Sequence, residues 1–330
     1  MAYSDGSAQF GDLPVSPGTE RELARAEELQ ARQLFPAILP AGPVYGVMEH
    51  VADGWQMDSM QASAPQAARD GLGWWFRLLA RTRSTEETER DEYWAASARL
   101  ETERLNTLTA AGREFRIVRA DQSYRYSQLA GPEPPRPGDC DAEPAREKYR
   151  AAEKMTGGLL GRPQQPGSPE LLGERWEFIP KGPMVPSDVT RDAVRALTAY
   201  PEIVMLPIRF AWAEQGDRGL WWPLRGTSRS PRGAQQSLAT WFGYLRQTAP
   251  AETAPAELAA YQPAEARLET ERVSRLTVAG QRYRIIRVQT VVRTGPDGPE
   301  PPRPSDHDPE PPMTGETEAL RGMGLIDDDT

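Results

Sequence analysis

Hydrophobic positions along the chain follow a helical period in some segments and a strand-like period in others. In residues 65–80, PQAARDGLGWWFRLLA, apolar side chains recur at spacings of three, four and seven, at Leu72, Trp75, Phe76 and Leu79. This period predicts one buried helical face. Upstream, VYGVMEHV and WQMDSM flank Asp53-Gly54. Because Asp-Gly readily adopts the positive φ angles of a tight turn, segment 44–60 predicts a β-hairpin.

Other elements flank these two. Thr19 followed by Glu22 fits a capping box that opens a helix over 19–35. The acidic run 84–105 predicts a helix after the first apolar one, and 106–127 alternates like a strand on both sides of an Ala-Gly step. That step indicates a second hairpin or a long returning strand. A proline-rich run, GPEPPRPGDCD, then leaves the sheet in an extended conformation.

The chain uses one long stretch twice. Residues 99–119 read RLETERLNTLTAAGREFRIVR and residues 267–287 read RLETERVSRLTVAGQRYRIIR, with 13 of 21 positions identical. Chance would give roughly one identity, so the stretch marks an internal duplication of a domain-sized unit. The apolar helix recurs as well, because Leu238, Trp241, Phe242 and Leu245 repeat its residue types and spacing.

The duplication predicts an α+β fold made of two tandem, pseudo-symmetric α-ββ-αα-ββ units, in which helices pack on small antiparallel sheets. The expected parts are a disordered N-terminus (1–18), the first unit (19–141), a Pro/Gly-rich connector (142–186), the second unit (187–308) and an acidic tail (309–330). The connector holds one predicted helix, 143–155. The two units are expected to pack together like the subunits of a homodimer.

Charge and composition narrow the classes of function. A net charge of −9 argues against nucleic-acid or anionic-membrane binding, which depends on a basic surface. With no apolar run long enough to span a bilayer, no secretory signal and a single cysteine, Cys140, we expect a cytoplasmic protein without disulfides. Two histidines leave little for a zinc site, so neither a metal nor a cofactor is predicted.

Motifs of common enzymes are missing from the sequence. It contains no GxxxxGK[ST] loop, no GxGxxG after a strand, no CxxC, no HExxH and no GxSxG elbow. This lowers the expectation of catalysis and favours a non-catalytic protein.

Charged residues occupy part of a predicted apolar face. On a helical projection, Glu101 and Arg104 fall within the arc formed by Tyr93, Trp94, Ser97, Leu100, Leu105 and Leu108. One interpretation is a structural pair that also ties the helix to Arg116 and Arg119 of the next strand. The other is a polar cleft that binds an anionic small molecule through guanidinium groups. The candidate ligand-binding residues are Glu101, Arg104, Arg116, Arg119, Glu269, Arg272, Arg284, Arg287, Trp74 and Trp222.

Three further features carry weaker signals. Trp75 and Trp241 occupy matched core positions, whereas Trp74 and Trp222 are freer to form an exposed surface. The repeated PEPPRP is either a ligand for a partner's aromatic groove or, as we favour, a rigid strap along its own domain. The Asp-x-Asp that follows each copy is more typical of turns than of a metal site.

The strings EHVADGWQM, PQAARDGLGWWFRLLA, RLETERL, REFRIVRAD and GPEPPRP resemble an actinobacterial, Streptomyces-type family known only as a domain of unknown function. The resemblance covers most of 35–141 and, more loosely, 200–308. It implies no activity, cofactor or catalytic residue.

Two hypotheses follow from the sequence. The first is a cytoplasmic, non-catalytic interaction or regulatory module that binds another protein. The alternative is a protein or enzyme that binds an anionic small molecule in a cleft lined by the repeated Glu/Arg set.

Overall fold

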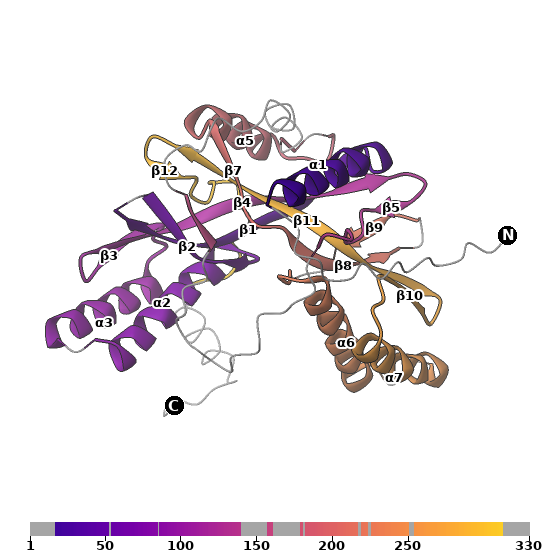
Figure 1. The fold of residues 1–330 in the computed structure, drawn as a ribbon. Helices are drawn as coiled ribbons and strands as arrows, with labels where there is room; N and C mark the ends of the chain where they lie inside the picture. The colour runs from indigo at the N-terminus through magenta and orange to yellow at the C-terminus, as the bar shows by residue number, and fades with distance from the viewer. Residues whose placement is uncertain are drawn as a thin grey trace.

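The fold is mixed α+β and is dominated by one large, curled antiparallel sheet (Figure 1). The structure is a computed structural model that describes residues 17–52, 54–84, 86–139, 157–160, 179–180, 182–216, 219–223, 226–250 and 254–312. Within these ranges there are six helices, namely α1 (Pro17–Leu34), α2 (Pro65–Thr82), α3 (Glu87–Thr102), α5 (Ser187–Ala199), α6 (Pro231–Thr248) and α7 (Pro255–Thr270).

The strands of the first half are β1 (Ala37–Val51), β2 (Gly54–Ala62), β3 (Thr107–Ala110), β4 (Arg113–Ser127), β5 (Gly131–Pro132) and β6 (Gly157–Leu160). Those of the second half are β7 (Glu202–Met205), β8 (Arg209–Gln215), β9 (Trp221–Pro223), β10 (Arg275–Val278), β11 (Gln281–Gly295) and β12 (Gly298–Pro299). The main path of the sheet runs β6-β2-β1-β4-β11-β8-β9.

Most predicted elements of the first half are confirmed. β1 and β2 form the hairpin, with Val51 paired to Gly54, and α2 begins at Pro65 as expected. The Ala-Gly step is a tight turn between β3 and β4, with positive φ at both Ala111 and Gly112. A second hairpin is therefore the correct interpretation of this segment.

One predicted helix is too long. α3 ends at Thr102, where the amide of Glu103 donates to the carbonyl of Arg99, and the chain then turns into β3. Leu108 is buried from that strand rather than from a helix. The helical projection of Arg104 and Leu105 is therefore wrong, because pairing with β4 requires extended backbone from residue 107 onward.

The two halves share one sheet instead of carrying two small ones. β4 and β11 pair antiparallel at its centre, where Gln122 lies opposite Thr290. The offset between these two positions is 290 − 122 = 168, and the two copies of the repeated stretch have the same offset, 267 − 99 = 168. The repeated strands thus meet at corresponding residues.

Each half builds its own helical core on this sheet. Phe76, Tyr93 and Phe115 pack together in the first half, and Phe242, Tyr261 and Tyr283 do so in the second. In Figure 1 the pair α2/α3 and the pair α6/α7 lie below the sheet, well apart from each other. The surfaces of the two helix pairs can therefore differ without disturbing the shared strands.

Several segments differ from expectation or lie outside the described part. β6, which pairs with β2, and β7, which pairs with β11, are not predicted by the sequence pattern. The expected helix 143–155, residues 1–16 and the tail beyond residue 312 lie outside the described residues. No helix within the described ranges is long and apolar enough to cross a membrane.

Candidate functional site

The predicted Glu/Arg pair has other partners than expected. Glu101 forms an ion pair with Arg77 of α2. Arg104 lies 3.7 Å from Asp308 and donates to the carbonyl of Glu310 at 3.0 Å. The expected tie between this pair and the arginines of β4 is wrong, because the residues around and after β12 occupy those arginines.

Each proline-rich segment bridges the two halves. We call residues 131–139 the first strap and residues 298–308 the second strap. In the first strap, the amide of Glu133 donates to the carbonyl of Arg125 at 2.8 Å, while its own carbonyl accepts from the amide of Arg287 in the second half at 3.0 Å. The second strap mirrors this, since the carbonyl of Glu300 accepts from the amide of Arg119 at 2.9 Å. The straps do follow their own strand, and they also join the halves.

A buried ion cluster lies beneath the second strap. Arg119 donates to Asp121 at 2.7 Å and to Asp306 at 3.1 Å, and all three side chains are at most a tenth exposed. Arg303 pairs with Glu300 at 2.6 Å, and Arg293 lies 3.7 Å from both Asp121 and Glu300. Three guanidinium groups thus face three carboxylates, which offsets the desolvation of each charge.

The first strap covers a second cluster with a different source of charge. Arg287 donates to Asp139 at 3.2 Å, and Arg136 pairs with Glu133 at 2.5 Å. The counterpart of Asp121 here is Gln289, which brings no charge. A carboxylate from outside the repeated strands takes its place.

Glu28 of α1 supplies that carboxylate. It lies 2.8 Å from Arg136 and 3.2 Å from Arg125. With Glu28 included, three carboxylates lie under the first strap, as under the second. They are those of Glu28, Glu133 and Asp139. Helix α1 thus completes the first cluster.

This role of Glu28 predicts a stability effect that depends on pH. Burial disfavours its charge, but hydrogen bonds from Arg136 and Arg32 lower its pKa to about 2. Because the folded pKa is depressed, the stabilisation is complete above the unfolded pKa of about 4.3 and is lost as the pH falls towards 2. Glu28→Gln should lower the free energy of unfolding by about 2 kcal/mol at pH 7, measured by urea denaturation.

The difference in free energy of unfolding between Glu28→Gln and the wild type should be much smaller at pH 2.5 than at pH 7. The exposed Glu22 of the same helix offers a matched control, since Glu22→Gln removes a surface carboxylate and should leave the free energy of unfolding unchanged. A gap of equal size at both pH values would contradict the assignment.

The predicted tryptophans divide as expected in exposure. Trp75 and Trp241 are partly buried against the two helical cores. Trp74 and Trp222 are 57% and 60% exposed. Their role in ligand binding stays a prediction.

Arg284 is the predicted residue with the least compensated charge. It lies on β11 opposite Arg275 of β10, is 2% exposed, and donates through Nη1 to the carbonyl of Ala130. Its Nε and Nη2 have no hydrogen-bond partner among the described residues. Burial, together with the charge of Arg275 directly across the strand pair, lowers the pKa of Arg284 to about 10.

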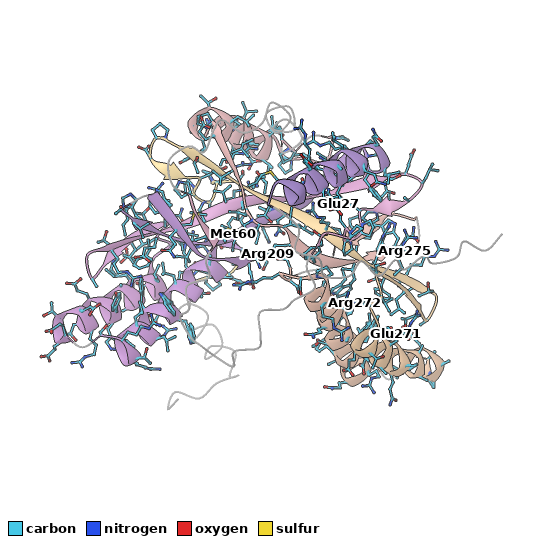
Figure 2. The ribbon with its side chains drawn as sticks, in the orientation of Figure 1. Glu27, Met60, Arg209, Glu271, Arg272 and Arg275 are labelled. Carbon is cyan, nitrogen blue, oxygen red and sulfur yellow. The ribbon has the colours of Figure 1, made fainter. Side chains whose placement is uncertain are left out.

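A cavity of about 630 Å³ adjoins this guanidinium group. None of the described residues that line it is acidic. Arg275 has no ion-pair partner in the described part of the chain, and Arg282 donates to the amide oxygen of Gln215 at 3.3 Å. Figure 2 shows Arg275 on β10. The wall includes Arg267, Arg275, Arg282, Arg284, Tyr126, Trp221 and Tyr283.

The strand pairing at the matching place in the first half is the same. Thr107 lies opposite Arg116 there, as Arg275 lies opposite Arg284 here. The charges differ, because Glu114 stands where the second half has Arg282, and it lies 4.0 Å from Arg116.

Arg116 is also better satisfied than its counterpart. It donates to the carbonyls of Asp297 and Pro299, and its guanidinium carbon lies 4.6 Å from the centre of the Trp55 ring. The charge of Arg116 is therefore better offset in the first half than the charge of Arg284 is at the corresponding position of the second half.

Sequence reasoning found Arg284 but missed Arg267, Arg275 and Arg282. A signal is present in the aligned copies, because Thr107 and Glu114 change to arginine at corresponding positions. For Arg275 and Arg282 the signal lies in residues that differ between the copies, whereas Arg267 repeats Arg99 and carries no such signal.

The remaining predicted residues do not line this cavity. Arg272 lines a separate cavity of about 260 Å³ under the first strap. Glu269 contributes its backbone carbonyl to Arg232 of α6. The structure thus does not bring the ten predicted residues together at one place.

Comparison with known proteins gives a family but no relative of established function. No curated protein and no solved structure matches the chain significantly. The model of a family of unknown function, DUF5954, matches residues 20–309. Since this match covers most of the 330 residues, the chain belongs to the DUF5954 family.

Proposed function

We propose that this protein is a non-catalytic binding protein for an anionic small molecule, held in the arginine-lined cavity of the second half. One observation carries the proposal: the buried guanidinium group of Arg284 adjoins a cavity with three more arginines and no acidic residue among its described lining. An unpaired buried charge costs several kcal/mol unless a counter-charge is supplied. A bound anion would supply it.

The lining suits a ligand with more than one negative charge. Guanidinium groups bind phosphate and carboxylate through paired hydrogen bonds, and the lining offers those of Arg275, Arg282 and Arg284. The guanidinium group of Arg267 is paired with Glu271 at 2.8 Å. The cavity volume of about 630 Å³ falls within the range of small-molecule sites. Phosphorylated or polycarboxylate metabolites are therefore the proposed ligand class, and a regulatory role would follow from occupancy of this site.

Replacing Arg284 should separate stability from binding. Arg284→Met removes an uncompensated buried charge, so we expect the free protein to become more stable by about 1 kcal/mol. The same variant should lose the rise in melting temperature that pyrophosphate or citrate gives the wild type. Thermal unfolding with and without each anion, at constant ionic strength, measures both effects.

The first half offers a matched control. Arg116→Met should destabilise the protein by about 1 to 2 kcal/mol, because Arg116 has carbonyl and aromatic partners, and it should leave the response to the anions intact. The double variant Arg275→Thr/Arg282→Glu copies the first half and should also abolish the response. If neither pyrophosphate nor citrate stabilises the wild type more than this double variant, the proposal is rejected.

We also infer that the chain consists of two tandem, pseudo-symmetric units, 19–141 and 187–308, related by an approximate twofold axis between Gln122 and Thr290. The pairing of corresponding residues at the central strands supports this. So does the repetition of the strap contacts in both directions. Anion binding would then belong to the second unit alone. In the first unit, the charge of Arg116 at the corresponding position is offset by Glu114.

A further inference from the structure

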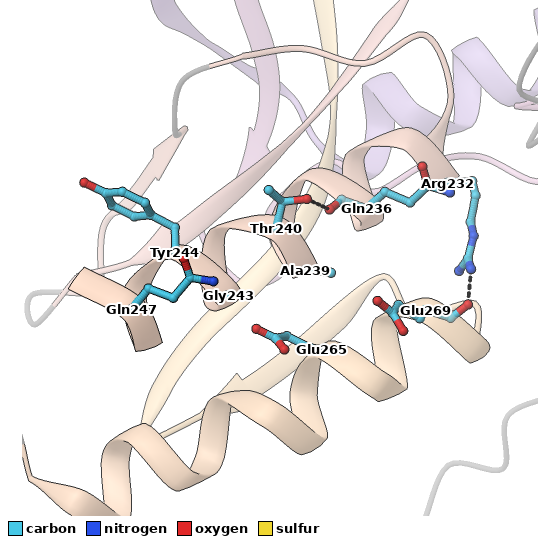
Figure 3. Close-up of a pocket in the computed structure, with 9 residues that line it drawn as sticks. All are labelled: Arg232, Gln236, Ala239, Thr240, Gly243, Tyr244, Gln247, Glu265 and Glu269. Atoms are coloured by element: carbon cyan, nitrogen blue, oxygen red, sulfur yellow. Dashed lines mark hydrogen bonds between the residues drawn. The ribbon is translucent and has the colours of Figure 1, made fainter. Parts of the chain in front are cut away.

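The second half contains another open site between helices α6 and α7, lined by two glutamates and one arginine, Arg232. A groove of about 710 Å³ separates the two helices, and Figure 3 shows the residues that line it. Gly243 and Thr240 of α6 form one wall. Glu265 and Glu269 of α7 form the other, and their carboxylates point towards α6 (Figure 3).

In the first half a guanidinium group fills the corresponding space. Arg77 of α2 reaches across to α3, where it forms an ion pair with Glu101 and donates to Ser97 at 3.0 Å. At the corresponding positions the second half has Gly243 in place of Arg77 (243 − 77 = 166) and Thr240 in place of Trp74 (240 − 74 = 166). The groove thus lies where the first half carries two larger side chains, of which Arg77 reaches across to α3.

The acidic partner is kept although its arginine is lost. Glu269 corresponds to Glu101 (269 − 101 = 168), and no described residue pairs with its carboxylate. Among the described residues, its backbone carbonyl accepts a hydrogen bond from the guanidinium group of Arg232, which also lines the groove. Glu265 corresponds to Ser97 (265 − 97 = 168) and adds a second carboxylate, which Arg246 pairs at 2.8 Å.

We propose that the α6/α7 groove binds a guanidinium group, carried by an arginine side chain of a partner protein. In the first half, the same arrangement of two helices and a carboxylate holds an arginine side chain, that of Arg77, which crosses from α2 to α3. The ligand class therefore comes from the pair Arg77 and Glu101, not from the presence of acidic residues alone. This inference is independent of the anion cavity, because the two sites share no lining residue.

Glu269 should be the principal contact. Because the carboxylate of Glu265 is already paired with Arg246, the carboxylate of Glu269 is the available acceptor for a new guanidinium group. The groove also leaves room beside Tyr244 and Gln247 for the chain that carries the arginine. An exposed contact of this kind gives modest affinity, so binding by the partner would depend on further contacts around the groove.

Calorimetric titration of the full chain with agmatine and with N-acetyl-arginine methylamide tests the proposal. The wild type should bind one equivalent of either probe, and tighter binding of the amide would identify a peptide source rather than a free amine. Glu269→Gln should weaken binding by about fivefold, the upper end of the loss expected for one exposed ion pair. Gly243→Arg should abolish binding, because the new side chain places its own guanidinium group opposite Glu269.

The first half supplies the reciprocal control. Arg77→Gly should open a matching groove beside Glu101 and raise the stoichiometry from one equivalent to two. If this variant is too unstable for calorimetry, agmatine should raise its melting temperature more than that of the wild type. Unchanged binding in both Gly243→Arg and Glu269→Gln would overturn the proposal, as would a wild type that binds neither probe.

Discussion

Arg119→Met is expected to lower the free energy of unfolding by about 4 kcal/mol, the largest effect that we predict for a single charged residue. Arg119 is 5% exposed and links Asp121 at 2.7 Å to Asp306 at 3.1 Å. Its removal would leave two carboxylates buried without their main counter-charge. Breaking a buried ion pair from one side typically costs about 3 to 5 kcal/mol.

Few other groups near Arg119 can offset the charges of Asp121 and Asp306. Burial alone would lower the pKa of Arg119, yet the charges of Asp121, Asp306 and Glu300 raise it above its ordinary value. The hydroxyl of Tyr45 lies beside the same cluster, where burial and the negative charge of Asp306 raise its pKa and keep it protonated. Tyr45 cannot replace a cation, and Arg293 lies 3.7 Å from Asp121 whereas Arg119 lies 2.7 Å away, so the loss of Arg119 would be compensated only in part.

The corresponding arginine of the other cluster provides the control. Arg287 donates to Asp139 at 3.2 Å, but its side chain is 13% exposed and its strand carries Gln289 where Asp121 would be. Arg287→Met should therefore cost only about 2 kcal/mol. Urea denaturation of both variants at pH 7 gives the comparison. Equal losses of unfolding free energy in the two variants would contradict the assignment of Arg119 as the main counter-charge of Asp121.

Local elements of this fold are predictable because their signals are local. The apolar period of α2, the Asp-Gly turn of the first hairpin and the Ala-Gly turn before β4 each depend on a few neighbouring residues. The duplication also predicts that both halves repeat much of the order of elements. The end of α3 escapes prediction because no glycine or proline marks it, and only pairing with β4 sets that boundary.

Long-range pairing could not be derived from the sequence. Nothing in residues 113–127 or 281–295 indicates that these strands pair with each other at Gln122 and Thr290. The same holds for the straps, whose side-chain contacts with the opposite half join residues 148 and 187 positions apart. The partners of Arg119 and Arg287 are therefore visible only in the folded chain.

The two proposed sites lie where the halves differ, not where they agree. Some arginines and glutamates kept in both copies join the halves through their backbones, namely Arg119 with Glu300 and Arg287 with Glu133. Arginine stands in the second copy where the first has Thr107 and Glu114, and the cavity lies beside these arginines. Glycine stands where the first copy has Arg77, and the groove beside Glu269 lies there.

Gly298→Ala is expected to lower the free energy of unfolding by about 3 kcal/mol, because the second strap enters its path over β4 at this residue. Gly298 has a φ of +102°, which alanine adopts only with strain. A Cβ atom there would also lie 2.5 Å from Nε1 of Trp55 and 3.1 Å from Nη1 of Arg116. Trp55 is 8% exposed and Arg116 lies over its ring, so neither can move aside freely.

Two other glycines separate backbone strain from the steric clash. Gly42 has a similar φ of +109°, and a Cβ atom there would have nothing within 4 Å, so Gly42→Ala should cost only the strain, about 1 kcal/mol. Gly131 of the first strap has a φ of +78° and would place a Cβ 2.9 Å from Nε1 of Trp221, which predicts an intermediate loss. Chemical denaturation of the three variants should therefore rank Gly298, Gly131 and Gly42 in decreasing order of cost. If Gly42→Ala were as destabilising as Gly298→Ala, the steric clash with Trp55 and Arg116 would contribute nothing to the free-energy cost of Gly298→Ala.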